Sequence, residues 1–137
     1  MERFKMEKDF IIDGFRCVIV GQRMGHRCGY IEIPADHELY GKDYDDIHID
    51  VHGGWTYSGY THSNYPAEAS GNSWWIGFDC GHLGDAKDLD LIKSFGDDEL
   101  TKYYVATEER FLEYGTIRTT EYVENELINA VKQLKEL

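Results

Sequence analysis

The chain has 137 residues, of which 42% are hydrophobic and 14% aromatic, a composition that predicts one folded domain over residues 1–137 and excludes a disordered chain. Its 26 acidic and 14 basic residues give a formal net charge of −12 at pH 7. Proteins that bind duplex nucleic acid usually present a basic face, so this charge argues against such a partner.

Three further features of the sequence bear on the cellular compartment of the protein. No apolar run reaches transmembrane length, so we expect no membrane partner. The first ten residues are charged and contain no apolar signal-peptide core. The three cysteines cannot all pair within one chain. Together these features predict a soluble, cytoplasmic protein with reduced thiols.

The first predicted element is a β-hairpin in residues 9–20. Two apolar runs flank Asp13 and Gly14, and this dipeptide is a strong hairpin signal because both turn positions favour positive φ. Residues 29–34 (GYIEIP) predict another extended segment, which ends at the proline.

The middle of the chain predicts further short strands. Residues 48–59 are expected to be extended at first and then broken at Gly53 and Gly54. Residues 60–72 predict a loop, which leads into an apolar strand at residues 74–80. Strands at these spacings predict an antiparallel sheet in the N-terminal two-thirds of the chain.

The last third of the chain predicts helices. Residues 86–96 favour a short helix that ends at the glycine, whereas residues 100–114 are ambiguous between helix and extended structure. Thr119 or Thr120 can cap a final amphipathic helix. Its apolar stripe has helical spacing and consists of Val123, Leu127, Val131 and Leu134. The fold class is therefore α+β, a sheet packed by helices that include this C-terminal one.

The stretch WWIGFDCGHLGD, residues 74–85, combines aromatic, acidic, imidazole and thiol side chains. Strand alternation divides its first half into a core face and a ligand face. The expected core face carries Trp74, Ile76 and Phe78, and the expected ligand face carries Trp75, Gly77 and Asp79.

Two arrangements would suit a metal ion. One is a tetrahedral zinc site made of two pairs with one intervening residue each, a poor match to the usual spacing: His26, Cys28, Cys80 and His82. The other is one polar face of a strand, for which contact with solvent is the favoured interpretation: His48, Asp50 and His52. We therefore expect no metal and no cofactor.

Nucleophilic catalysis is a further alternative. Cys80, with His52 or His82 as base and Asp79 or Asp85 as orienting acid, has the residue types of a thiolate mechanism. A lone cysteine is more often a small buried hydrophobe.

Binding a ligand without catalysing a reaction requires fewer side chains to converge at one place. Aromatic rings would stack a base, imidazole, guanidinium, hydroxyl and glycine backbone groups would receive phosphate, and carboxylates would bind sugar hydroxyls. The candidate residues are His26, Arg27, His52, Gly53, Gly54, Trp55, Thr56, Tyr57, Ser58, Trp75, Asp79, His82 and Asp85. Trp75→Ala is expected to weaken such binding at least tenfold while leaving the fold intact.

Five blocks in this order resemble a family of small proteins from phages, prophages and bacterial genomes: GHRCGY, YGKDYDD, VHGGWTYSG, WWIGFDCGHLGD and TIRTTEYVENELINAVKQL. The likeness covers residues 24–134, with a departure at Trp55, where the family typically has leucine. The resemblance implies a setting in the cytoplasm of a bacterial host cell. By analogy it implies a counter-defence protein that acts on nucleotide second messengers, such as cyclic nucleotides or cyclic ADP-ribose-type signals.

The leading hypothesis is therefore a protein, expected to be a homo-oligomer, that binds and sequesters a small anionic, nucleotide-like immune signal. The first alternative is a phosphodiesterase-like hydrolase that cleaves such a signal with His52, Asp79 and His82. The second alternative is an inhibitor that contacts a host protein through its acidic surface.

Overall fold

The hairpin predicted at Asp13 and Gly14 opens the fold. The computed structural model describes residues 2–109 and 115–137, and in it β1 (Phe4–Ile12) pairs with β2 (Phe15–Gln22) in antiparallel register. Asp13 and Gly14 have φ values of 47° and 86°, as a tight hairpin turn requires. This prediction is confirmed.

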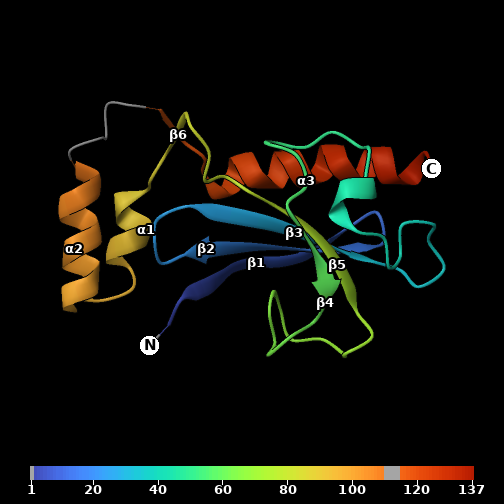
Figure 1. Cartoon of the computed structure of the whole chain (residues 1–137), viewed down its shortest axis with the longest axis horizontal. Coiled ribbons are helices and arrows are strands. Elements are labelled where there is room, and N and C mark those ends of the chain that lie inside the picture. Colours follow the sequence, from blue (N-terminus) through green and yellow to red (C-terminus); the bar gives the residue numbers. More distant parts are fainter. Residues whose placement is uncertain (1, 110–114) are drawn as a thin grey trace.

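The main sheet has five strands and is antiparallel throughout. After the hairpin come β3 (Arg27–Ile33), β4 (Tyr57–Tyr60) and β5 (Trp74–Asp79), and the order across the sheet is β1-β2-β3-β5-β4. Figure 1 shows these strands, with β1 and β4 at the two edges of the sheet. The strand β5 lies between β3 and β4, so both of its backbone edges are hydrogen-bonded.

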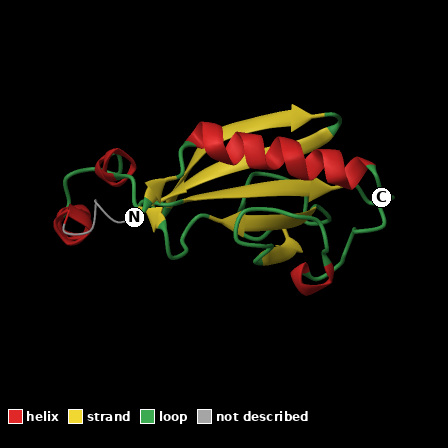
Figure 2. Cartoon of the chain, turned by 90° about the horizontal axis from the view of Figure 1, so that it is seen from above, coloured by secondary structure: helices red, strands yellow, loops and turns green. Residues whose placement is uncertain are grey.

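The remaining elements surround this sheet. A 3-10 turn, η1 (Tyr44–Asp46), precedes β4, and a second, two-stranded parallel sheet pairs β6 (Asp85–Ala86) with β7 (Thr116–Ile117). The long helix α3 (Thr120–Lys135) crosses one face of the main sheet, as Figure 2 shows from above. The α+β architecture predicted from the sequence is therefore correct.

Two short helices lie beyond one end of the sheet (Figure 1). The helix expected over residues 86–96 is shorter, α1 (Leu89–Lys93), because β6 pairing occupies its predicted start. The ambiguous segment 100–114 begins as α2 (Glu99–Glu108), and its residues 110–114 lie outside the described part of the chain.

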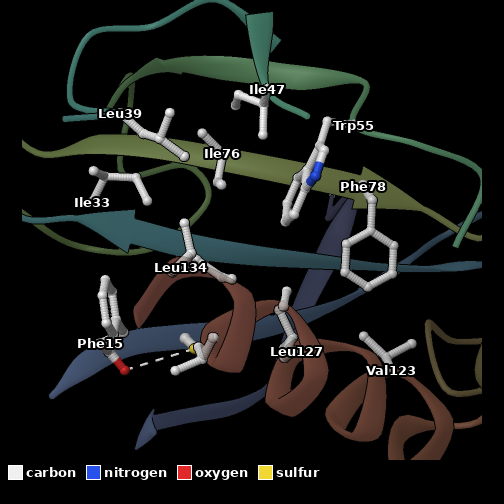
Figure 3. Close-up of a cluster of buried hydrophobic side chains, with 14 of the residues drawn as sticks. Phe15, Ile33, Leu39, Ile47, Trp55, Ile76, Phe78, Val123, Leu127 and Leu134 are labelled. Atoms are coloured by element: carbon white, nitrogen blue, oxygen red, sulfur yellow. Dashed lines mark hydrogen bonds between the residues drawn. The ribbon is translucent and has the colours of Figure 1, made fainter. Parts of the chain in front are cut away.

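The core beneath α3 follows the predicted apolar stripe. Figure 3 shows Leu127 and Leu134 pointing from the helix toward the sheet residues Ile76 and Phe78. The four stripe residues are at most 1% exposed, and the Thr119 hydroxyl accepts a hydrogen bond from the Tyr122 backbone N–H at the start of the helix. Truncating one such leucine to alanine costs about 2–5 kcal/mol, so this helix is a main source of stability.

The opposite face of the sheet is also covered. Tyr30, Tyr57, Tyr65 and Trp75, here called the aromatic cluster, pack there with Val18, Val20, Cys28 and Ala67. Residues 61–73 supply Tyr65 and Ala67 and so close this face. Alternation along β5 was therefore predicted correctly for the α3 side, but the face expected to bind a ligand is a second core.

One predicted strand is absent. Residues 47–56 contain no strand, so the proposed common face of His48, Asp50 and His52 does not exist. His48 and Asp50 are exposed, whereas His52 turns inward. None of the helices within residues 2–109 and 115–137 is long and apolar enough to cross a lipid bilayer.

Candidate functional site

Four side chains from the sequence-predicted set converge where β5 ends. Asp79 terminates β5, His82 lies in the turn that follows, Asp85 begins β6, and His52 approaches from the loop before β4. The rings of His52 and His82 have centroids 5.8 Å apart. These residues, His52, Asp79, His82 and Asp85, are called the His–Asp cluster below.

Asp85 is the buried centre of this cluster, with a side chain only 2% exposed. Its Oδ1 accepts a hydrogen bond from Arg118 Nε at 2.9 Å, and its Oδ2 lies 2.9 Å from His52 Nε2. The backbone N–H of His82 also donates to Oδ2 at 3.1 Å. Burial disfavours the carboxylate, but the hydrogen bonds from His52 and Arg118 outweigh it and lower the pKa of Asp85 to about 2. Asp85 is therefore an anion at neutral pH.

The parallel pairing of β6 and β7 explains how Arg118 reaches this carboxylate. Asp85 is the register partner of Thr116, which places the chain just before α3 alongside the turn after β5. Arg118 follows two residues later, and its guanidinium also lies over the Tyr122 ring, 4.8 Å from the centroid. Residues far apart in sequence thus form one charged centre.

His52 is held by α3 as well as by Asp85. Its Nδ1 lies 2.8 Å from Tyr122 Oη, and its backbone N–H donates to Glu126 Oε1 at 2.7 Å. Both ring nitrogens therefore have partners, which fixes the orientation of the imidazole.

Arg118, Tyr122 and Glu126 were not among the sequence-predicted site residues. Tyr122 and Glu126 are four residues apart on α3, a spacing that places both polar side chains on one helix face, whereas Arg118 precedes the helix.

His82 is the most accessible imidazole of the cluster, with 37% of its side chain exposed. Its Nδ1 lies 3.4 Å from Asp85 Oδ2, and its Nε2 lies 3.7 Å from Asp79 Oδ1. The ring packs against Gly53, where a Cβ atom would lie only 2.3 Å from His82 Cε1. Gly53 also has a φ of 70°, so glycine is required there by both the backbone and the imidazole.

Asp79 is oriented by its own neighbours. Thr56 Oγ1 donates to Asp79 Oδ2 at 3.0 Å, and the Gly81 backbone N–H donates to Oδ1 at 2.9 Å. The cluster therefore has two carboxylates of different character, one buried and paired with arginine, the other half-exposed beside His82.

His26 borders the cluster but is not a cation. Burial, followed by the nearby positive charge of Lys87, lowers the pKa of His26 to about 4. Lys87 Nζ lies 3.4 Å from His26 Nδ1. The imidazole is therefore neutral at pH 7, which contradicts the expectation that its charge receives a phosphate.

The expectation that Arg27 receives a phosphate is also wrong. Its guanidinium is buried and forms ion pairs with Glu7, at 2.7 Å, and with Asp88, at 2.9 Å, and it also donates to the Arg118 carbonyl oxygen. Two carboxylates already balance its charge, so Arg27 ties β3 to β1 and to the start of α1 rather than binding an anion.

The aromatic residues expected to stack a base are mostly in the two cores. Trp75 is 0% exposed, and its Nε1 donates to Thr61 Oγ1 at 2.8 Å. Trp55 is 9% exposed and meets Phe78 edge-to-face on the α3 side, as Figure 3 shows. Tyr57 is half-buried in the aromatic cluster. The predicted stacking roles of Trp75 and Trp55 are therefore wrong, because neither indole face is open.

The remaining polar groups of the predicted set divide between two places. Thr56 joins the His–Asp cluster through Asp79, whereas the Ser58 hydroxyl donates to Asp43 and accepts from the Tyr44 backbone N–H. The Gly54 backbone N–H donates to the Val51 carbonyl within a turn. It is thus already bonded, contrary to its expected role in phosphate binding.

The structure contradicts both expected roles of the cysteines, as zinc ligands and as a nucleophile. Cys28 lies on the aromatic face of the sheet and Cys80 in the α3-side core, so the four-ligand zinc site with His26 and His82 does not form. Burial raises the pKa of the Cys80 thiol to about 12, which excludes a thiolate nucleophile at neutral pH.

Comparisons with known proteins add no identification. A scan against protein-family models gives no match, and searches of curated proteins and of solved structures give none either.

Proposed function

We propose that this protein is a hydrolase that cleaves a phosphate ester in a small, anionic, nucleotide-like signal. The observation that supports this choice is the convergence of His52, from the loop before β4, with Asp79 and His82 at the end of β5, because these are residue types that hydrolysis of a phosphodiester requires. The competing hypothesis of a base-stacking pocket loses support because its two tryptophans are buried.

Two cations beside the carboxylates of the cluster would face the phosphate of an anionic substrate. Arg118, whose side chain is 26% exposed, pairs with Asp85, and Lys87 lies against His26 at the border of the site. These cations would attract a phosphate to a protein whose formal net charge is −12. Thr56 adds a hydroxyl next to Asp79.

The proposed reaction is redox-neutral. The oxygen of a water molecule forms a bond to phosphorus, the ester P–O bond breaks, and a proton lost by the water is balanced by one gained by the leaving oxygen. The half-exposed Asp79 carboxylate lies where it can orient that water, and Asp85, held by Arg118, fixes both imidazoles.

The proposed substrate class rests on the resemblance of the sequence blocks to phage and bacterial proteins. Within the same proposal the substrate is a cyclic nucleotide or cyclic ADP-ribose-type immune signal, and the place of action is the cytoplasm of a bacterial host. An oligomer would be compatible with the site, since all the cluster residues come from one chain.

The test is turnover of defined nucleotides followed by mass spectrometry. Wild-type protein is incubated with cyclic mononucleotides, cyclic dinucleotides, cyclic ADP-ribose and bis(4-nitrophenyl) phosphate, in parallel with D79N, H82Q and the control H62Q. His62 is an exposed imidazole in the loop after β4 and contacts Ser63. We expect H82Q and D79N to lower turnover about 100-fold or more, and H62Q to leave it unchanged.

Two other results would end the hydrolase proposal. A nucleotide recovered intact, and only after denaturation, would establish sequestration instead. Nucleotides that all remain free and unchanged would remove both small-molecule functions and leave the acidic surface as the feature to test against host proteins.

A further inference from the structure

Three donor atoms of the His–Asp cluster have the mutual spacing of metal ligands. One ligand atom from each of His52, His82 and Asp85 lies within 4.8 Å of the other two. Two of the separations are 2.9 Å, from Asp85 Oδ2 to His52 Nε2, and 3.4 Å, from Asp85 Oδ2 to His82 Nδ1. Tetrahedral coordination with bonds of about 2.0–2.1 Å separates neighbouring donors by about 3.3 Å. The three atoms are therefore close to the arrangement that one ion would require.

The far side of His52 has the partner expected of a metal-bound histidine, because its Nδ1 lies 2.8 Å from Tyr122 Oη. Such a hydrogen bond orients a ligating ring and sets its tautomer. On the far side of His82, Nε2 faces the Asp79 carboxylate at 3.7 Å. Arg118 occupies Asp85 Oδ1, so Oδ2 alone is directed to the imidazoles.

The donor types select the class of ion. Two imidazole nitrogens and one carboxylate oxygen suit a divalent transition metal, whereas Mg²⁺ and Ca²⁺ prefer oxygen ligands. Two histidines, one carboxylate and an open position are a donor set of hydrolytic zinc sites. Solvent reaches the cluster at His82, so a fourth position can hold water or substrate.

We infer that His52, His82 and Asp85 form a binding site for a divalent transition-metal ion such as Zn²⁺. This replaces the expectation of a metal-free protein. Ion binding itself stands on the donor geometry alone. A role for the ion in lowering the pKa of a bound water and polarising a phosphate rests on the proposed hydrolase function.

The experiment measures metal binding directly. Tag-free protein is stripped with a chelator, dialysed, and titrated with Zn²⁺ by isothermal calorimetry. Co²⁺ is added separately to record the visible absorption that distinguishes four- or five-coordinate from octahedral cobalt. H82Q is the main variant because His82 is half-exposed and its loss spares the core. H62Q is the matched control, and D85N is included with circular dichroism to check its fold, since Asp85 is buried.

We expect one Zn²⁺ per chain, a low-coordinate cobalt spectrum, and at least a 100-fold loss of affinity in H82Q with none in H62Q. This loss should exceed the roughly 10–100-fold effect of removing an outer partner. No binding, or Zn²⁺ binding unchanged in H82Q, would overturn the site. Zn²⁺ binding without turnover of any phosphate ester would keep the site and end the hydrolase proposal. Turnover that survives complete chelation would keep the hydrolase proposal and overturn the role of the ion in it.

Discussion

The aromatic cluster and the His–Asp cluster each include one residue of β5, but these two residues have opposite environments. Trp75 and Asp79 share one face of β5, four residues apart, and both belong to the residue set that the sequence predicts for a ligand. Trp75 is covered by residues 61–73, whereas Asp79 lies past the covered area, beside a half-exposed histidine. A side chain on the correct face of a strand is therefore available to a ligand only where nothing else packs over that face.

The largest effect on stability is expected from a substitution at Trp75. Trp75→Ala should lower the free energy of unfolding by about 3–5 kcal/mol, because it removes a fully buried indole and leaves a cavity. Urea denaturation measures the change, with Tyr103→Ala as the control on an exposed aromatic residue. An unchanged denaturation midpoint in Trp75→Ala would contradict the burial and restore Trp75 as a ligand-stacking residue.

A second test adds volume instead of removing it. In Gly77→Ala the new Cβ would lie 2.3 Å from Tyr30 Cδ1, so the tyrosine ring must shift. Overpacking of this kind costs about 1–3 kcal/mol. Gly59→Ala, on the neighbouring strand β4, is the control because its nearest side-chain atom is 3.6 Å away. Thermal denaturation of the two variants should separate them, and equal melting temperatures would mean that the aromatic cluster is loosely packed.

The third test moves to the His–Asp cluster. Tyr122→Phe removes the hydroxyl next to His52 Nδ1 and should cost about 0.5–1.5 kcal/mol of stability, the usual value of one hydrogen bond. The same change should weaken Zn²⁺ binding about 10–100-fold, because it removes an outer partner of a ligand. Calorimetric titration is the readout, and Tyr103→Phe is the control. Loss of stability with unchanged Zn²⁺ affinity would assign Tyr122 a structural role only.

The smallest effect on stability is expected at His82. His82→Gln should change the free energy of unfolding by no more than about 0.5 kcal/mol, since the ring is half-exposed. The same variant should have lost its metal affinity. Substitutions in the aromatic cluster are therefore expected to change mainly stability, and this substitution in the His–Asp cluster mainly metal binding. Chemical denaturation in the presence of a chelator measures the free energy of unfolding without a contribution from bound metal. A large destabilisation there would mean that the His–Asp cluster maintains the fold as the aromatic cluster does.

Much of the fold could be predicted because its signals are local. The hairpin at Asp13, the alternation along β5 and the cap at Thr119 each depend on a few neighbouring residues. The error at residues 48–52 has a local cause too. Alternating polar and apolar residues suggested a strand, but the segment has no strand partner, and Trp55 instead donates its indole N–H to the Ile49 carbonyl.

The candidate site was predicted in its residue types but not in its assembly. His52, Asp79, His82 and Asp85 were all among the expected residues, and the structure brings them together. Arg118, however, meets Asp85 only through the pairing of two short parallel strands, which no local pattern predicts.

The sequence by itself determined the hairpin at Asp13, the strand that contains Trp75 and the C-terminal helix, and which side chains can carry chemistry, because periodicity and residue type act over a few positions. Only the tertiary structure decided which face of β5 is closed and which ionisable groups meet. Closure depends on a loop that packs over Trp75, and the cluster depends on α3 lying along the sheet beside the turn after β5. Both are contacts between distant segments, and their outcome is settled by packing rather than by local preference.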